Sequence, residues 1–154
     1  MNTETLWRCP KCKRQFRRRK QLHSCVSYSV RDHFKDKPAA RKQTFDRLIA
    51  KAKQFGPVRT DAVKSLITIS GRFHFAAVYV RRDSLTVEFV LERKLSDRRI
   101  EKVQKVLARY SHFVRLTGLE DVDTQLVNWL QEAYFVTGPL RDDEKPTLFR
   151  SERR

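Results

Sequence analysis

The first 25 residues contain every cysteine of the chain. They read Cys9-Pro10-Lys11-Cys12 and, further on, His23-Ser24-Cys25. A Cys-x-x-Cys pair followed about ten residues later by further His or Cys donors is the usual pattern of a small zinc site. So short a segment cannot bury enough apolar surface to fold alone, so bound metal would supply its folding free energy, on the order of 10 kcal/mol. The spacing therefore predicts a metal-organised finger with Zn²⁺ as its cofactor.

The fourth ligand stays open between two histidines. In a two-Cys, two-His finger, a β-hairpin packs on a helix around Phe16 and Leu22. Cys25 then replaces the first helix histidine, and His33 is the nearest donor for the last position. Alternatively, His23 and Cys25 both bind. The helix must then break between them, because residues two apart on a helix point about 200° apart.

Positive charge is concentrated at the N-terminal end. Of the net charge of +16, residues 1–25 contribute eight Lys or Arg against one acid, and residues 26–62 nine against four. Such asymmetry predicts a surface that faces DNA or RNA through salt-sensitive phosphate contacts, or one that docks an acidic protein. The candidate nucleic-acid-binding residues are Arg14, Arg17, Arg18, Arg19 and Lys20. In the two-Cys, two-His register, the base-reading positions would be Arg18, Gln21 and Ser24.

The remainder of the chain predicts an α+β domain. Phe45, Leu48 and Ala52 recur at helical spacing after Pro38, and Gly56-Pro57 ends that helix. Apolar and polar residues then alternate with period two over 66–70, 73–80 and 85–91, and 110–116 is a further strand. Residues 121–136 form a second amphipathic helix. The prediction is a small zinc finger followed by an antiparallel sheet of about four to five strands flanked by two helices.

The expected organisation is a zinc-finger-like segment over 1–33, the α+β domain over 34–140 and a mobile tail over 141–154. No stretch approaches the roughly 18 apolar residues of a membrane span, and Met1 to Arg8 shows no hydrophobic signal core. The expected location is therefore the cytoplasm, without membrane association. The oligomeric state is not predicted.

Five segments spread over nearly the whole chain share their pattern with a known family: Trp7-Arg8-Cys9-Pro10-Lys11-Cys12, Gln21-Leu22-His23-Ser24-Cys25, Phe55-Gly56-Pro57-Val58, Phe75-Ala76-Ala77-Val78 and Trp129-Leu130-Gln131-Glu132-Ala133-Tyr134. On these segments the chain resembles the domain of unknown function 5655 family, a mainly bacterial group. Relatives carry the His-Ser-Cys triplet, which favours His23 over His33. They also tend to have a proline within the region of 99–109, which favours a strand there although the apolar spacing is helical. The resemblance implies no activity.

Two further patterns concern anion binding and catalysis. The resemblance implies a basic set that would form an anion pocket if it converged on one sheet face: Lys64, Arg72, Arg93, Arg98 and His112. The alternative is ordinary charge on strand surfaces. Asp83 and Glu92-Arg93-Lys94 faintly resemble a Mg²⁺-dependent nuclease. No Ser-His-Asp order or Gly-rich phosphate loop occurs, so a non-enzymatic nucleic-acid-binding zinc protein is the leading hypothesis.

Overall fold

The computed structural model describes residues 6–23, 25 and 28–138. A two-stranded hairpin at the N-terminus is followed by an α+β domain. In chain order the elements are β1 (Trp7–Arg8), β2 (Gln15–Phe16), α1 (Val30–Phe34), α2 (Ala39–Ala52), β3 (Arg59–Ala62), β4 (Ile67–Ser70), β5 (His74–Val80), β6 (Leu85–Leu91), β7 (Ile100–Val106), β8 (Arg109–Leu116), a 3₁₀ turn (Leu119–Asp121) and α3 (Thr124–Thr137).

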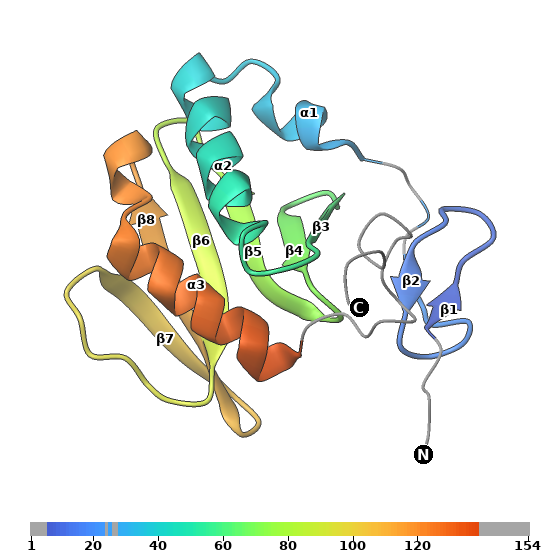
Figure 1. The fold of residues 1–154 in the computed structure, drawn as a ribbon. Helices are drawn as coiled ribbons and strands as arrows, with labels where there is room; N and C mark the ends of the chain where they lie inside the picture. The colour runs from blue at the N-terminus through green and yellow to red at the C-terminus, as the bar shows by residue number, and fades with distance from the viewer. Residues whose placement is uncertain (1–5, 24, 26–27, 139–154) are drawn as a thin grey trace, which may run out of the picture.

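The main sheet has six strands in the order β3-β4-β5-β6-β8-β7, and every neighbouring pair is antiparallel. Helices α2 and α3 lie on the same face of this sheet, and the β1–β2 hairpin sits beside its β3–β4 end (Figure 1). The predicted α+β class is confirmed, but the count of four to five strands is wrong. The missed strand is β3, a short edge strand whose four residues are all half-buried and show no alternation.

Strand β7 confirms the strand predicted within 99–109. Its pairing with β8 shifts register between Ile100 and Lys102, so a bulge interrupts the period of two. Because of the bulge, Ile100 and Val103, three residues apart in sequence, pair with Val114 and His112, two residues apart on β8, and this spacing imitates that of a helix. Leu107 completes that false pattern from the β7–β8 turn, where it is 93% exposed with a φ of 57°.

The core lies between the sheet and the two long helices. Leu85, Val87, Phe89 and Leu91 of β6 are all fully buried, and the residues between them are half-buried on the other face. From α3, Leu126 and Leu130 pack against them. The strong alternation of apolar and polar residues in the sequence therefore reflects a sheet that helices cover on one face only.

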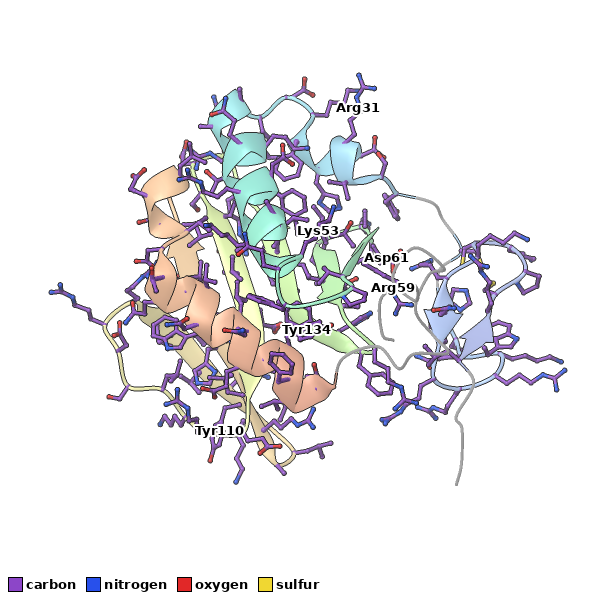
Figure 2. The ribbon with its side chains drawn as sticks, viewed as in Figure 1. Arg31, Lys53, Arg59, Asp61, Tyr110 and Tyr134 are labelled. Carbon is purple, nitrogen blue, oxygen red and sulfur yellow. The ribbon has the colours of Figure 1, made fainter. Side chains whose placement is uncertain are left out.

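The Tyr134 side chain contacts two of the other segments that carry the family resemblance. Its ring packs edge-on against Phe75 at 5.4 Å and also contacts Phe55, and its hydroxyl donates to the Pro57 carbonyl oxygen at 3.4 Å. Figure 2 labels Tyr134, which belongs to α3. A Cβ at Gly56, where φ is +150°, would collide with the Tyr134 hydroxyl, so this loop requires glycine.

Helix boundaries differ slightly from the predictions. Helix α3 begins at Thr124 rather than Asp121, because the Asp121 carboxylate accepts from the Thr117 backbone N–H and closes the 3₁₀ turn. Asp123 caps α3 by accepting from the Leu126 N–H. The short helix α1 precedes α2 and was not predicted. Within the described residues no helix is long and apolar enough to cross a bilayer, and the predicted tail 141–154 lies outside them.

Candidate metal centre

The β1–β2 hairpin presents the first two thiols. Trp7 pairs with Phe16 and Arg8 with Gln15, so residues 9–14 form the turn. The Lys13 N–H donates to the Cys9 carbonyl oxygen and the Cys9 N–H to the Arg14 carbonyl oxygen, both at 2.9 Å. Lys13 adopts a φ of 64°, which reverses the chain sharply. Cys9 is 3% exposed and Cys12 half-buried. We call residues 6–25 the knuckle.

The second half of the knuckle is not a helix, which corrects the two-Cys, two-His register. No helix occurs among its described residues, and Leu22, expected in its core, is 98% exposed. Instead His23 stacks on Phe16 with ring centroids 4.1 Å apart, and Trp7 packs 6.0 Å from Phe16. The base-reading positions proposed for that helix therefore do not exist, and Ser24 lies outside the described residues.

Without a helix, His23 and Cys25 can face the same point. The sulfurs of Cys12 and Cys25 each lie 3.3 Å from His23 Nε2, and the sulfurs of Cys9 and Cys25 are 3.7 Å apart. All four donor atoms lie within 4.8 Å of one another. Metal–sulfur bonds of about 2.3 Å and metal–nitrogen bonds of about 2.0 Å in a tetrahedron imply edges of roughly 3.8 Å and 3.5 Å. These four side chains therefore lie close enough to hold a metal ion.

His33 lies elsewhere. It belongs to α1, whose start is fixed by a capping box in which Ser29 and Asp32 exchange hydrogen bonds. Its Nε2 lies 2.6 Å from the Val63 carbonyl oxygen, just beyond β3. It is not one of the four clustered donors. Of the two histidines left open by spacing alone, His23 is therefore the one that lies with the three cysteines.

The Gln21 backbone orients the His23 ring. Its carbonyl oxygen lies 2.6 Å from Nδ1, so the Nδ1–H donates to it and the Nε2 lone pair faces the thiols. Sequence reasoning missed this contact, because a backbone carbonyl carries no residue signature. The hydrogen bond to this carbonyl is the largest cause that raises the pKa of His23. The neighbouring Cys9 and Cys12 side chains raise it further, although burial opposes the shift. A cation bound at Nε2 would favour the neutral ring, in which the remaining proton is on Nδ1.

The pKa values of the three thiols shift in different directions. The backbone N–H groups of Cys12 and Lys11 stabilise the Cys9 thiolate and lower its pKa to about 6, although burial opposes the shift. The pKa of Cys12 is also lowered, because hydrogen bonds from Arg14 outweigh its burial. Burial and the neighbouring Cys9 thiol raise the pKa of Cys25. Three thiolates at this separation would repel one another, and a divalent cation between them would offset that repulsion.

The five predicted nucleic-acid-binding residues surround β2 but face in different directions. Arg14 lies over the Phe16 ring at 5.9 Å, inside the knuckle. Arg17 lies over the Phe73 ring at 4.7 Å, so it points toward the α+β domain. The exposed side chains of the following turn are Arg18, Arg19 and Lys20.

The structure does not bring the predicted anion-binding set together. His112 is fully buried under the helices, where Nε2 accepts from the Leu95 N–H at 2.9 Å and burial lowers its pKa. Arg93 forms a bidentate pair with Glu132 of α3. Arg72 lies in the β4–β5 turn, and Lys64 and Arg98 lie in the β3–β4 and β6–β7 connections. Pairing of β8 with β6 places His112 on the covered face, opposite Phe89.

The two carboxylates of the nuclease-like pattern, those of Asp83 and Glu92, also lie apart in the structure. Asp83 precedes β6 and Glu92 follows it, so the seven residues of this strand separate them. At about 3.3 Å per residue, this strand alone spans roughly 20 Å, so the two carboxylates lie beyond its opposite ends. They cannot ligate one Mg²⁺ ion.

Comparison with known proteins identifies the domain that follows the four clustered donors. The model of the family described as Domain of unknown function (DUF5655) matches residues 30–137, from the first residue of α1 to the last of α3. The four clustered Cys and His donors precede the matched region. No curated protein and no solved structure matches the chain. Because the match covers well over half of its 154 residues, the chain belongs to the DUF5655 family.

Proposed function

We propose that this is a zinc protein in which a structural Zn²⁺ folds a basic knuckle that binds nucleic acid. The observation that carries the proposal is the cluster of Cys9, Cys12, His23 and Cys25. Three sulfurs and one nitrogen suit Zn²⁺, which favours four such ligands in a tetrahedron. Four protein donors leave no position for water or substrate, so the metal's role is folding rather than catalysis.

Charge supports nucleic acid as the partner. The described residues of the knuckle contain no Asp or Glu. Arg18, Arg19 and Lys20 are exposed on one turn beside the metal site, which would hold them in place. Lys and Arg side chains that contact phosphates release bound counterions, so affinity would fall steeply with added salt.

The test combines zinc stoichiometry with binding of fluorescent DNA and RNA at low and high salt. The expected result is one zinc per chain and an affinity that a chelator abolishes. In the triple variant Arg18→Ala, Arg19→Ala and Lys20→Ala, the slope of log affinity against log salt should fall by up to about 2 to 3. A matched control removes three exposed charges outside the knuckle, with Lys53→Ala, Arg82→Ala and Lys94→Ala.

Two outcomes would contradict the proposal. Equal losses in the test and control variants would mean that only net charge matters. Binding to polyglutamate but to no nucleic acid, with the same sensitivity to the knuckle variant, would instead favour an acidic protein as the partner.

A further inference from the structure

A cleft of about 690 Å³ separates the knuckle from the α+β domain. The knuckle contributes Phe16 and Arg17 to one wall, and the domain contributes Arg59, Phe73 and Arg109 to the other. Arg59 of β3 also bridges the two walls, because its Nη1 donates to the Gln15 side-chain oxygen. Figure 2 shows Arg59 at the edge of the sheet that faces the knuckle. A volume of this size is typical of a small-ligand site.

Four guanidinium groups reach this cleft from separate parts of the chain. Arg17 follows β2, Arg59 lies in β3, Arg72 in the β4–β5 turn and Arg109 at the start of β8. Among the described residues that line the cleft there is no Asp or Glu. A basic lining without any carboxylate is complementary to an anion.

These arginines are held in place by their surroundings. Arg17 and Arg72 both lie over the Phe73 ring, at 4.7 and 4.9 Å. Arg109 donates to the Val136 carbonyl oxygen at the end of α3, at 3.3 Å. Prior ordering of the side chains reduces the entropy lost when a ligand binds.

Much of the remaining lining is apolar, which indicates the kind of anion that would fit the cleft. Phe16 and Phe73 contribute aromatic surface, and the β7–β8 turn contributes Val106 and Leu107. The Leu107 side chain is 93% exposed, and its backbone adopts a φ of 57° in this turn. Inorganic phosphate alone would leave this apolar surface unused. A nucleotide combines a phosphate with a flat apolar base and uses both kinds of lining.

We propose that the cleft binds one unpaired nucleotide of a single-stranded nucleic acid, an inference that rests on the proposed function. The phosphate contacts the arginines, and the base packs against the aromatic residues and Leu107. A duplex cannot enter in this way, because its bases are already stacked and paired. One wall belongs to the knuckle, so the site is complete only when the metal holds the knuckle folded.

The test measures binding of the zinc-loaded full chain to a fluorescent single strand and to the duplex of the same sequence. The single strand should bind at least about tenfold more tightly. The double variant Arg59→Gln with Arg109→Gln should lose about tenfold or more in affinity for the single strand only. The matched control, Arg82→Gln with Arg98→Gln, changes the same charge on exposed residues outside the cleft and should leave the preference intact.

A second variant protects the test against misfolding. Leu107→Asn removes the apolar side chain at an exposed position whose positive φ suits asparagine, so the fold should tolerate it. The affinity for the single strand should fall about fivefold. A free nucleoside monophosphate should displace the strand, whereas inorganic phosphate at equal concentration should not.

The failures of the two proposals are distinguishable. If single strand and duplex bind equally and only the Arg18, Arg19 and Lys20 variant weakens them, the cleft inference is overturned while the knuckle's function stands. If no nucleic acid binds, both are overturned.

Discussion

Replacing His23 with alanine should weaken zinc binding by roughly 10² to 10³-fold. Structural zinc contributes about 10–16 kcal/mol in small fingers, so each of four ligands averages about 2.5–4 kcal/mol, and 1.4 kcal/mol corresponds to a factor of ten. The variant also loses the His23 ring that stacks on Phe16 at 4.1 Å and the Nδ1 contact to the Gln21 carbonyl oxygen. Both losses loosen the knuckle, so the measured effect should lie at the upper end of that range.

The assay is competition for zinc between the full chain and a chromophoric chelator, with the Co²⁺ form followed by absorbance. His23→Cys should restore a tetrahedral site and recover most of the affinity, with a stronger thiolate-to-metal absorption. The matched control is His33→Ala, which removes the contact to Val63 and should destabilise the domain by only about 0.5–1.5 kcal/mol. The reasoning is refuted if His33→Ala weakens zinc binding as much as His23→Ala does.

Three further predictions concern the knuckle, the core and pH. Leu22→Ala should leave zinc affinity unchanged because Leu22 is 98% exposed, whereas Phe16→Ala should lower it; the chelator assay compares the two. Gly56→Ala should destabilise the fold by about 2 kcal/mol or more in urea unfolding, because its Cβ would meet the Tyr134 hydroxyl at a φ of +150°. Burial holds the pKa of His112 below its ordinary value, so its contribution to stability is complete above about pH 6.5 and declines below it, by at most about 1.4 kcal/mol per pH unit. The loss of unfolding free energy between about pH 7 and pH 5.5 should therefore be smaller in His112→Phe.

The helices and strands whose apolar residues recur at a regular spacing were predictable from the sequence. Strand β6 alternates buried and half-buried side chains along its whole length, and α3 carries Leu126, Trp129, Leu130 and Ala133 at helical spacing. Helix α3 ends at Gly138, whose N–H donates to the Tyr134 carbonyl oxygen. Strand β3 gave no such signal, because a four-residue edge strand with the sequence Arg-Thr-Asp-Ala neither alternates nor is buried on both faces.

Strand β7 shows where periodicity misleads. Its apolar spacing is helical only because a bulge falls between Ile100 and Lys102 and because Leu107 lies in the following turn. The proline of the resembling sequences indicated a strand where periodicity did not. A bulge depends on the partner strand, so it cannot be read from the period of one segment.

The sequence by itself determined the three clustered thiols, the main strands and the two long helices, because ligand spacing and side-chain alternation act between near neighbours in the chain. Tertiary structure alone decided three other matters. It turned His33 toward Val63 and left His23 with the cysteines; it paired β8 with β6 so that His112 faces the core; and it gathered Arg17, Arg59, Arg72 and Arg109 around one cleft. Each of these depends on strand register or on the docking of distant segments, and neither is encoded in local spacing.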